Sequence, residues 1–364
     1  MIRNLLLVAG ARPNFMKIAP LIRVLESRRD FRYQLLHTGQ HYDSRMSDVF
    51  FSDLGIPPPA FHLNVGSGTH AQQTASIMTA FEPVLAETTP DCVVVVGDVN
   101  STLACTIVAK KQHVAVAHVE AGLRSGDLAM PEEINRIVTD SISDYLFASE
   151  QSGVDNLLRE GKVEASVHFV GQVMVDNLFY EVGRLDRDPA PAGSSEELKR
   201  GKERYGVVTL HRPSNVDDPG VLKRIMQALA EISGTLPLVF PAHPRTRARI
   251  EEFGTAVPEG LTIVEPLGYR DFLNLWRDAS VVVTDSGGLQ EETTALGVPC
   301  VTVRENTERP VTIELGTNVL VGSDPEKIVA SAMAALGGAI EARRPPLWDG
   351  KAAERIVDVL GDLL

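Results

Sequence analysis

A glycine turn at the beginning of a predicted helix is the feature of this sequence that points most clearly to a bound anion. Ser286, Gly287 and Gly288 come shortly after the apolar run 281–284. Backbone amides at the beginning of a helix are well suited to hold phosphate. Glu292, one turn further on, is placed to bind ribose hydroxyls, although an acid in a first helical turn can equally complement the helix dipole.

Three acids in the first half of the chain are candidates for proton transfer. Asp98 and Glu120 each follow an apolar run, and Glu132 lies in "MPEEINR", where a helix is predicted to begin. Each has a structural alternative. Asp98, like Asp285, can cap a helix, and Glu132 or Glu133 can complement a helix dipole. Several acids around one ligand would supply both a general acid and a general base.

Cations and imidazoles follow nearly every apolar run. Ligands of open α/β sheets bind beside the carboxyl ends of the strands, so side chains at these positions can meet a ligand. The basic, imidazole and amide side chains found there are Arg12, Lys17, Gln40, His41, Arg124, His211, Arg212, His243, Arg245 and Arg304. Several of them, together with Arg309 in "TERP", can form charge-assisted hydrogen bonds with phosphate. The set predicts a nucleoside diphosphate with a further group attached.

The sequence lacks the fingerprints of two common nucleotide sites. No GxxxxGK[ST] motif occurs, which argues against a P-loop enzyme, and the turn after the first apolar run reads "GARPNF" instead of GxGxxG. We therefore expect no dinucleotide cofactor. Apart from His37 and His41, the histidines do not show HxxxH or HxH spacing, so we expect no metal site.

Composition and charge argue against several classes of partner. The 364 residues carry a formal net charge of −13, which disfavours nucleic-acid binding and a basic membrane-binding surface. The N-terminal apolar run "LLLVA" is too short for a signal peptide or a membrane span. Three cysteines without paired spacing are typical of a reducing compartment, so we expect a cytoplasmic protein.

Short valine-rich runs alternate with longer amphipathic stretches along the whole chain. The runs cover residues 5–9, 33–37, 92–96, 114–119, 145–148 and 168–170, and then 207–210, 238–240, 261–264, 281–284, 300–303 and 319–321. Strands that are apolar on both faces are typical of parallel sheets covered by helices. The pattern predicts an α/β protein with two Rossmann-like, doubly wound domains facing a cleft.

The predicted domains divide the candidate residues between them. Residues 1–170 form the first domain and carry the three acids, and residues 171–351 form the second and carry the glycine turn. The stretch 186–197, "DRDPAPAGSSEE", is the most linker-like part of the chain. The amphipathic segment 352–364 is expected to pack back onto the first domain.

The order of the motifs along the chain resembles that of one enzyme family. The motifs are "GARPNFMKIAPL", "TGQHYD", "GDVNST", "HVEAGLRS", "PEEINR", "LHRP", "HPRT", "DSGGLQEE" and "TERP". Together they resemble the non-hydrolysing UDP-N-acetylglucosamine 2-epimerases over roughly residues 3–325. The resemblance implies the glycosyltransferase-B fold, reversible conversion of UDP-N-acetylglucosamine into UDP-N-acetylmannosamine, no cofactor, and a homodimer.

The resemblance also implies roles for individual residues. Catalytic roles fall to Asp98, Glu120, Glu132 and His211. Contacts with the UDP-sugar fall to Arg12, Lys17, Gln40, His41, Arg136, Arg212, His243, Ser286, Gly287, Gly288, Glu292 and Arg309. The chain departs from many members at Asn14, where they have Glu, and in "HRPSN", where they have "HRREN". We expect these departures to affect regulation rather than activity.

The implied reaction explains why several acids are needed. The proton on carbon 2 of an N-acetylated hexose is not acidic, and the sequence lacks the nicotinamide fingerprint that an oxidative route would require. Departure of UDP from carbon 1 acidifies this proton, and a carboxylate can then remove it to give 2-acetamidoglucal. Re-addition of UDP, with a proton delivered to the other face, inverts carbon 2.

Three alternatives stay open at this point. A glycosyltransferase of the same fold would need an acceptor groove and one base rather than several acids. A hydrolysing epimerase would release UDP irreversibly. A non-catalytic nucleotide-sugar sensor could keep the glycine turn but would have no reason to retain three acids.

Overall fold

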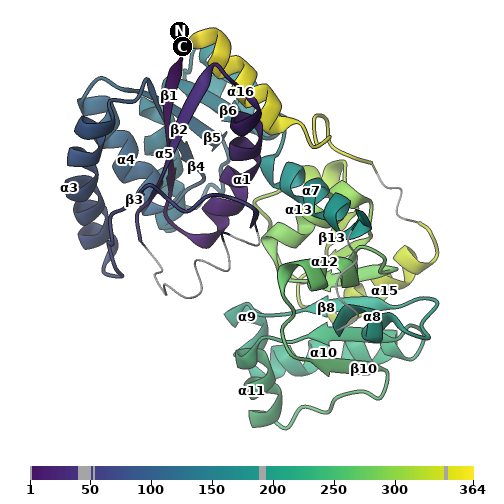
Figure 1. Cartoon of the computed structure of the whole chain (residues 1–364). Coiled ribbons are helices and arrows are strands. Elements are labelled where there is room, and N and C mark those ends of the chain that lie inside the picture. Colours follow the sequence, from purple (N-terminus) through teal and green to yellow (C-terminus); the bar gives the residue numbers. More distant parts are fainter. Residues whose placement is uncertain (1, 40–50, 52–53, 188–193, 340–342) are drawn as a thin grey trace. The chain divides into compact units, whose positions relative to one another are not determined.

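The chain forms two compact units. The computed structural model describes residues 2–39, 51, 54–187, 194–339 and 343–364. The first unit comprises Met1–Asn177 and Pro346–Leu364, and the second comprises Leu178–Pro345 (Figure 1). Helix α7 (Val173–Arg187) continues from the first unit into the second. The domain limits after residues 170 and 351 stay predictions.

The first unit is built on a seven-stranded parallel sheet. Its strands are β1 (Arg3–Ala9), β2 (Phe31–His37), β3 (Phe61–His62), β4 (Cys92–Val96), β5 (Ala115–Ala121), β6 (Tyr145–Ala148) and β7 (Val167–Phe169). They lie in the order β3-β2-β1-β4-β5-β6-β7. The strand order reverses between β1 and β4, and ligands of open α/β sheets bind at the carboxyl ends of strands beside such a reversal.

Helices cover both faces of this sheet. They are α1 (Arg12–Ser27), α3 (His70–Thr88), α4 (Asn100–Lys111), α5 (Pro131–Ile142), α6 (Gln151–Arg159), the 3-10 turn η1 (Glu164–Ser166) and α16 (Ala352–Leu363). Leu7 of β1 packs in a core with Ile22 of α1 and Ile356 of α16. Its neighbour Leu6 packs in a second core with Phe81 of α3. Both faces of β1 are therefore buried, which explains its continuous apolar run.

The second unit repeats this architecture with a six-stranded parallel sheet. Its strands are β8 (Gly206–Thr209), β9 (Leu238–Pro241), β10 (Leu261–Val264), β11 (Val281–Thr284), β12 (Cys300–Thr302) and β13 (Asn318–Leu320), in the order β10-β9-β8-β11-β12-β13. The helices are α8 (Ser194–Lys199), α9 (Pro213–Val216), α10 (Pro219–Ser233), α11 (Pro244–Glu252), α12 (Tyr269–Trp276), α13 (Gly287–Leu296), α14 (Val311–Glu314) and α15 (Pro325–Leu336). Here the strand order reverses between β8 and β11.

The predicted α/β class with two Rossmann-like domains is confirmed, since every predicted apolar run overlaps a strand of a parallel sheet. Two details differ from the prediction. The two-residue strand β3 was missed because it is too short to give a pattern. Strand β5 continues to Ala121, so Glu120 lies within the strand and not after it.

The C-terminal helix α16 belongs to the first unit, where it packs against α1 (Figure 1). Asp176 accepts hydrogen bonds from the backbone N–H groups of Ala352 (3.1 Å) and Ala353 (2.7 Å), and so caps the beginning of this helix. No helix among the described residues combines the length and the apolar character needed to span a bilayer.

Candidate active site

Glu120 is a buried acid held at a distortion of strand β5. The register of β5 against β6 shifts between Val119 and Ala121, and Glu120 itself has φ of 68°, which is uncommon for a residue other than glycine. Its side chain forms an ion pair with Lys17 of α1 and accepts a hydrogen bond from Nε2 of Gln172 (3.4 Å). The distortion therefore directs a desolvated carboxylate towards an ammonium group at the carboxyl edge of the sheet.

Gly97 makes room for this ion pair at the end of β4. It has φ of 67°, and a Cβ atom placed on it would lie 3.0 Å from Nζ of Lys17 and 3.5 Å from Oε2 of Glu120. The backbone of Gly97 is thus in close contact with both partners. Asp98 follows directly, so the two acids come from the ends of the neighbouring strands β4 and β5.

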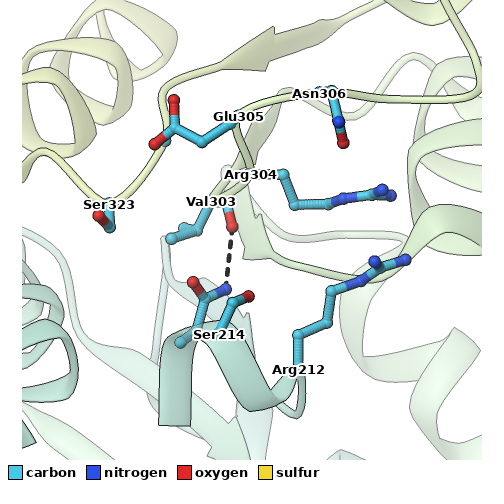
Figure 2. A pocket seen from close by; sticks show the side chains of 9 residues that line it. Arg212, Ser214, Val303, Arg304, Glu305, Asn306 and Ser323 are labelled. Carbon is cyan, nitrogen blue, oxygen red and sulfur yellow. Dashed lines mark hydrogen bonds between the residues drawn. The ribbon is translucent and has the colours of Figure 1, made fainter. Parts of the chain in front are cut away.

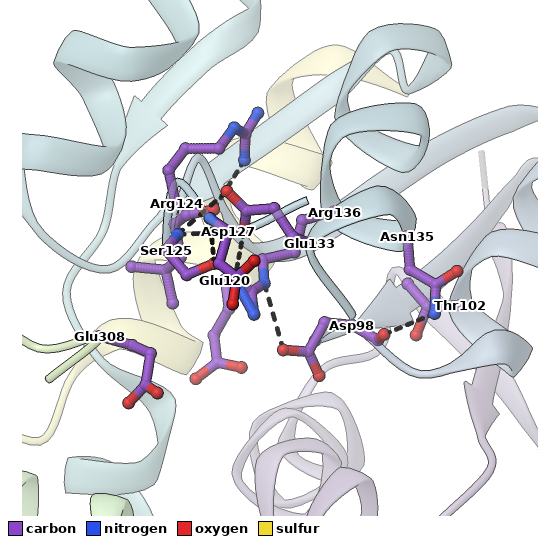
Figure 3. A network of polar contacts seen from close by, with 12 residues as sticks. Asp98, Thr102, Glu120, Arg124, Ser125, Asp127, Glu133, Asn135, Arg136 and Glu308 are labelled. Atoms are coloured by element: carbon purple, nitrogen blue, oxygen red, sulfur yellow. Dashed lines mark hydrogen bonds and ion pairs between the residues drawn. The ribbon is translucent and has the colours of Figure 1, made fainter. Parts of the chain in front are cut away.

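Asp98 is held by two residues of α5. Its carboxylate accepts a hydrogen bond from Nε of Arg136 (3.2 Å), and its backbone carbonyl accepts one from Nδ2 of Asn135 (2.9 Å). The Asp98 side chain is 38% exposed, so it remains open to a ligand. Figure 3 shows the carboxylates of Asp98 and Glu120 pointing to the same side of this network. Asp98 does not cap α4, because the N-cap residue is Val99.

The two neighbouring glutamates of α5 have different surroundings. Glu133 is buried, accepts hydrogen bonds from the backbone N–H groups of Ser125 (3.0 Å) and Gly126 (2.9 Å), and pairs with Arg136 (2.6 Å). Burial acts to raise the pKa of Glu133, but these backbone bonds and Arg136 outweigh it and hold the pKa below its usual value. Glu132 is half-buried and has no hydrogen bond or ion pair with the described residues. Glu133 is therefore the structural acid of the pair.

In the second unit, Asp285 anchors the loop that follows β8. This fully buried carboxylate accepts hydrogen bonds from the backbone N–H groups of His211 (3.0 Å) and Arg212 (2.9 Å) and from Nδ2 of Asn215 (3.1 Å). It also accepts from Nδ1 of His211 (2.8 Å). Although burial acts to raise the pKa of Asp285, these bonds, first that of the His211 side chain, lower it. Asp285 is therefore an anchor and not the N-cap of α13, which is Ser286.

This arrangement fixes how the His211 ring can act. Because Nδ1 donates to Asp285, a neutral ring carries its proton on Nδ1 and has Nε2 as an acceptor. The side chain is 51% exposed, so Nε2 is available to accept or deliver a proton. An imidazole oriented by a buried carboxylate is a common arrangement for acid–base catalysis.

The glycine turn lies where the sequence predicted it, at the beginning of α13. Ser286 is the N-cap, its side chain makes no capping hydrogen bond, and Gly287 and Gly288 are the first helical residues. The first amides of a helix lack partners within the helix and favour an anion. The guanidinium of Arg304 approaches this turn, since its Nη1 would lie 3.9 Å from a Cβ atom on Gly287.

The two glutamates of α13 also differ. Glu291 pairs with Nε of Arg309 (2.5 Å), which ties the loop containing "TERP" to the helix. Glu292 accepts a hydrogen bond from the hydroxyl of Tyr269 (2.9 Å). Burial raises the pKa of Glu292 to about 7, although the Tyr269 hydrogen bond acts against this.

A cavity of about 340 Å³ lies at the carboxyl ends of the strands of the second sheet. It is lined by Arg212, Ser214, Asn215, Val303, Arg304, Glu305, Asn306, Gly322 and Ser323. In Figure 2 the guanidinium groups of Arg212 and Arg304 extend in the same direction. Arg304 is held by a two-pronged ion pair with Glu308 (2.8 and 3.1 Å). Two fixed cations close to the glycine turn favour a phosphate-containing ligand.

Comparison with known proteins decides the family. A family model described as UDP-N-acetylglucosamine 2-epimerase matches residues 23–361. The chain belongs to this family. The resemblance seen in the motifs is thereby confirmed.

The similarity to individual family members extends over the whole chain. A UDP-N-acetylglucosamine 2-epimerase of Methanocaldococcus jannaschii is 41% identical over 98% of each chain, and its crystal structure with UDP-GlcNAc and UDP matches with a TM-score of 0.83 over 99% of each chain. A UDP-2,3-diacetamido-2,3-dideoxy-D-glucuronate 2-epimerase of Pseudomonas aeruginosa is 40% identical over 99% of this chain and 100% of the other. A Listeria monocytogenes structure, a putative UDP-N-acetylglucosamine 2-epimerase, is 30% identical with a TM-score of 0.87, over 100% of this chain and 97% of the other. The fold is therefore the glycosyltransferase-B fold.

Some predicted site residues are not placed by the structure with the acids of the first unit or with the glycine turn of the second unit. Gln40 and His41 lie outside the described residues. Arg12 is the first residue of α1, and its side chain is not described. His243 is the N-cap of α11, where its Nδ1 accepts a hydrogen bond from the backbone N–H of Arg245 (3.3 Å). Its predicted contact with the UDP-sugar stays a prediction.

Two residues of the site were missed from the sequence. Gln172 follows β7, and Tyr269 begins α12 after β10, so reading every strand end would have included both. Among the described residues, no group of three or more His, Cys, Asp and Glu side chains is arranged to hold a metal ion.

Proposed function

We propose that this epimerase interconverts UDP-N-acetylglucosamine and UDP-N-acetylmannosamine by eliminating UDP and adding it back. The observation that carries the proposal is the pair of acids at neighbouring strand ends, Glu120 buried against Lys17 and Asp98 held by Arg136. Inversion requires proton transfer at both faces of carbon 2, and two differently held carboxylates suit two such steps.

The proposed elimination and re-addition account for every bond and every proton. The bond between carbon 1 and the diphosphate oxygen breaks, UDP leaves with the electron pair, and a carboxylate takes the proton from carbon 2. The products are 2-acetamidoglucal and UDP. In the return step a proton is delivered to the opposite face of carbon 2 and the diphosphate oxygen bonds to carbon 1. Asp98, Glu120, Glu132 and the Nε2 atom of His211 are the proposed proton carriers.

The second unit is proposed to bind UDP. The amides at the beginning of α13, the residues Ser286, Gly287 and Gly288, would hold the diphosphate, and Glu292 would accept from the ribose hydroxyls. Arg212 and Arg304 would offset the charge that develops on departing UDP. The crystal structure of the Methanocaldococcus jannaschii relative with UDP-GlcNAc and UDP supports this ligand class.

A second substrate is favoured by one specific observation. The Pseudomonas aeruginosa relative, which acts on a diacetamido glucuronate linked to UDP, is nearly as similar to this chain as the Methanocaldococcus jannaschii relative. Both reactions invert carbon 2 beside an acetamido group, so the same acids would serve either. The two substrates differ at carbons 3 and 6 of the sugar.

We also propose that the protein is a cytoplasmic homodimer that supplies a precursor of surface polysaccharides. The proposal follows from the family and from the nucleotide-sugar substrate. Light scattering on the purified protein should give twice the mass of 39.5 kDa. A mass of one chain at micromolar concentration would contradict the dimer.

The function is tested by a proton NMR time course with each UDP-sugar separately. The expected result is a stable mixture of the two carbon-2 epimers of UDP-N-acetylglucosamine, with no free sugar. Accumulating free N-acetylmannosamine would show a hydrolysing enzyme, and an unchanged spectrum would favour a transferase or a sensor. Faster conversion of the diacetamido glucuronate would assign the second substrate.

A further inference from the structure

A fully buried histidine lies beneath the two acids of the first unit. His118 is on β5, two residues before Glu120, and its side chain has no exposed surface. Its Nε2 atom is 2.8 Å from the backbone carbonyl oxygen of Gly97, and its Nδ1 atom is 2.6 Å from Oδ1 of Asp140. A carbonyl oxygen can only accept a hydrogen bond, so Nε2 must carry a proton.

The partner at Nδ1 is a carboxylate with further donors around it. Oδ2 of Asp140 accepts from the backbone N–H of Gly122 (3.0 Å) and from Nη1 of Arg124 (2.8 Å). Burial acts to raise the pKa of Asp140, but the charges and hydrogen bonds of His118 and Arg124 outweigh it and lower the pKa. Nδ1 of His118 donates to this carboxylate, whose other oxygen already accepts two hydrogen bonds, so the His118 ring carries a proton on each nitrogen and a positive charge.

Other charged groups act on the same cluster. Arg124 also pairs with Glu160 through Nε (2.8 Å) and Nη2 (2.6 Å). Lys162 contributes a further positive charge that acts on Asp140 and Glu160. The buried centre thus contains His118 and Arg124 as cations around Asp140. A buried ion pair of this kind adds little to stability compared with apolar packing. Stability alone therefore does not explain why these charged side chains are buried here.

The cluster bonds to the backbone at Gly97 and Gly122, which lie close in sequence to the two candidate catalytic acids. Gly97 immediately precedes Asp98, and Gly122 follows Glu120 by two residues. Both glycines have positive φ, 67° and 82°, as does Glu120 at 68°. Such backbone conformations persist only when their surroundings fix them.

We propose that His118 is a positioning residue that, with Asp140 as its partner, holds the ends of β4 and β5 so that Asp98 and Glu120 keep the geometry needed for proton transfer. The expected fall in kcat rests on the proposed function. The charge state of the ring does not depend on that function. Asp140 comes from α5, the helix that also carries Glu132 and Arg136, so the same pair sets the position of this helix.

Two substitutions of His118 separate its hydrogen bonds. His118→Asn places an amide near the position of Nδ1, so it can keep the donor to Asp140 and lose the donor to Gly97. His118→Gln places an amide near Nε2 and does the reverse. Both variants remove the charge. We expect kcat to fall at least about tenfold in both, with the Kd for UDP changed less than about twofold, because UDP is proposed to bind the second unit.

The charge itself is measured without any substrate. In protein labelled with ¹⁵N-histidine, the His118 ring should show two protonated nitrogens at neutral pH, and its signals are identified by their loss in His118→Gln. Asp140→Asn should remove the second proton. An unprotonated ring nitrogen at neutral pH in the unsubstituted protein would overturn the proposal, as would unchanged kcat in both His118 variants. If the unsubstituted protein converts neither UDP-sugar, the proposed function fails, and the NMR measurement alone decides the state of His118.

Discussion

Asp98, Glu120 and Glu132 differ in what surrounds their carboxylates. Glu120 is buried against Lys17, Asp98 is partly exposed beside Arg136, and Glu132 has no partner among the described residues. Groups held in different environments can act as acid and base at the same pH. The three acids are therefore suited to different steps, and Glu133 is suited to none because its oxygens hold the backbone at Ser125 and Gly126.

Neutral substitution of the three acids should stop turnover without affecting nucleotide binding. Asp98→Asn, Glu120→Gln and Glu132→Gln should each lower kcat by about 10²–10⁴, the usual contribution of acid–base catalysis. The Kd for UDP, measured by calorimetry, should stay within about twofold. The matched control is Glu82→Gln on the exposed face of α3, which should be fully active. A kcat near normal in any of the three variants would remove that residue from the catalytic set.

Glu292 should make stability depend on pH. Its pKa in the folded protein is raised to about 7, so the stability that it contributes is present below the unfolded value of 4.5 and is lost as pH rises through about 7. Glu292→Gln removes this loss. The variant should therefore melt at a higher temperature than the unsubstituted protein at about pH 8 and not at about pH 5. A difference in Tm that is the same at both values would contradict the assignment.

At the scale of elements, the end of strand β4 depends on a glycine. Gly97→Ala would place a methyl group 3.0 Å from Nζ of Lys17 on a backbone with φ of 67°. Gly161 has φ of 86° and nothing within 4 Å of the corresponding position, so Gly161→Ala is the matched control. Both should lose about 1–2 kcal/mol of unfolding free energy, but only Gly97→Ala should lower kcat. Equal activity of the two variants would show that the Lys17–Glu120 pair tolerates displacement.

Sequence patterns were sufficient for the strands and for most of the strand-end residues. Each apolar run overlaps a strand, most of these strands are buried, and the residues after the runs, such as Asp98 and His211, do lie at the carboxyl ends of the sheets. The separate roles of Glu132 and Glu133 could not be predicted, because adjacent residues of one helix have the same pattern. Asp140 was missed because it reaches His118 from the middle of α5, and no sequence rule pairs those positions.

At the scale of the whole molecule, the chain returns to its first unit at the C-terminus. Ile356 of α16 is fully buried in the core of that unit, and Leu363 of the same helix is 41% exposed. Trp348 lies in the first unit and Trp276 in the second, and the sequence contains only these two tryptophans. Their fluorescence therefore reports on the two units separately.

Ile356→Ala should destabilise the first unit by about 2–5 kcal/mol, since it leaves a cavity in the core. Denaturation followed by Trp348 in a Trp276→Phe background should move to lower denaturant, while Trp276 in a Trp348→Phe background should report a smaller shift. Leu363→Ala is the control and should change neither transition measurably. A loss as large for Leu363→Ala would contradict the burial of α16 through its Ile356 face.

The central claim, epimerisation by elimination of UDP and its re-addition, is tested most directly by the hydrogen at carbon 2. The reaction is run in heavy water from UDP-N-acetylglucosamine, with no nicotinamide added, and the product is examined by NMR and mass spectrometry. The account predicts that UDP-N-acetylmannosamine carries one deuterium at carbon 2 from its first appearance. Product that retains the original proton at carbon 2 would contradict the account.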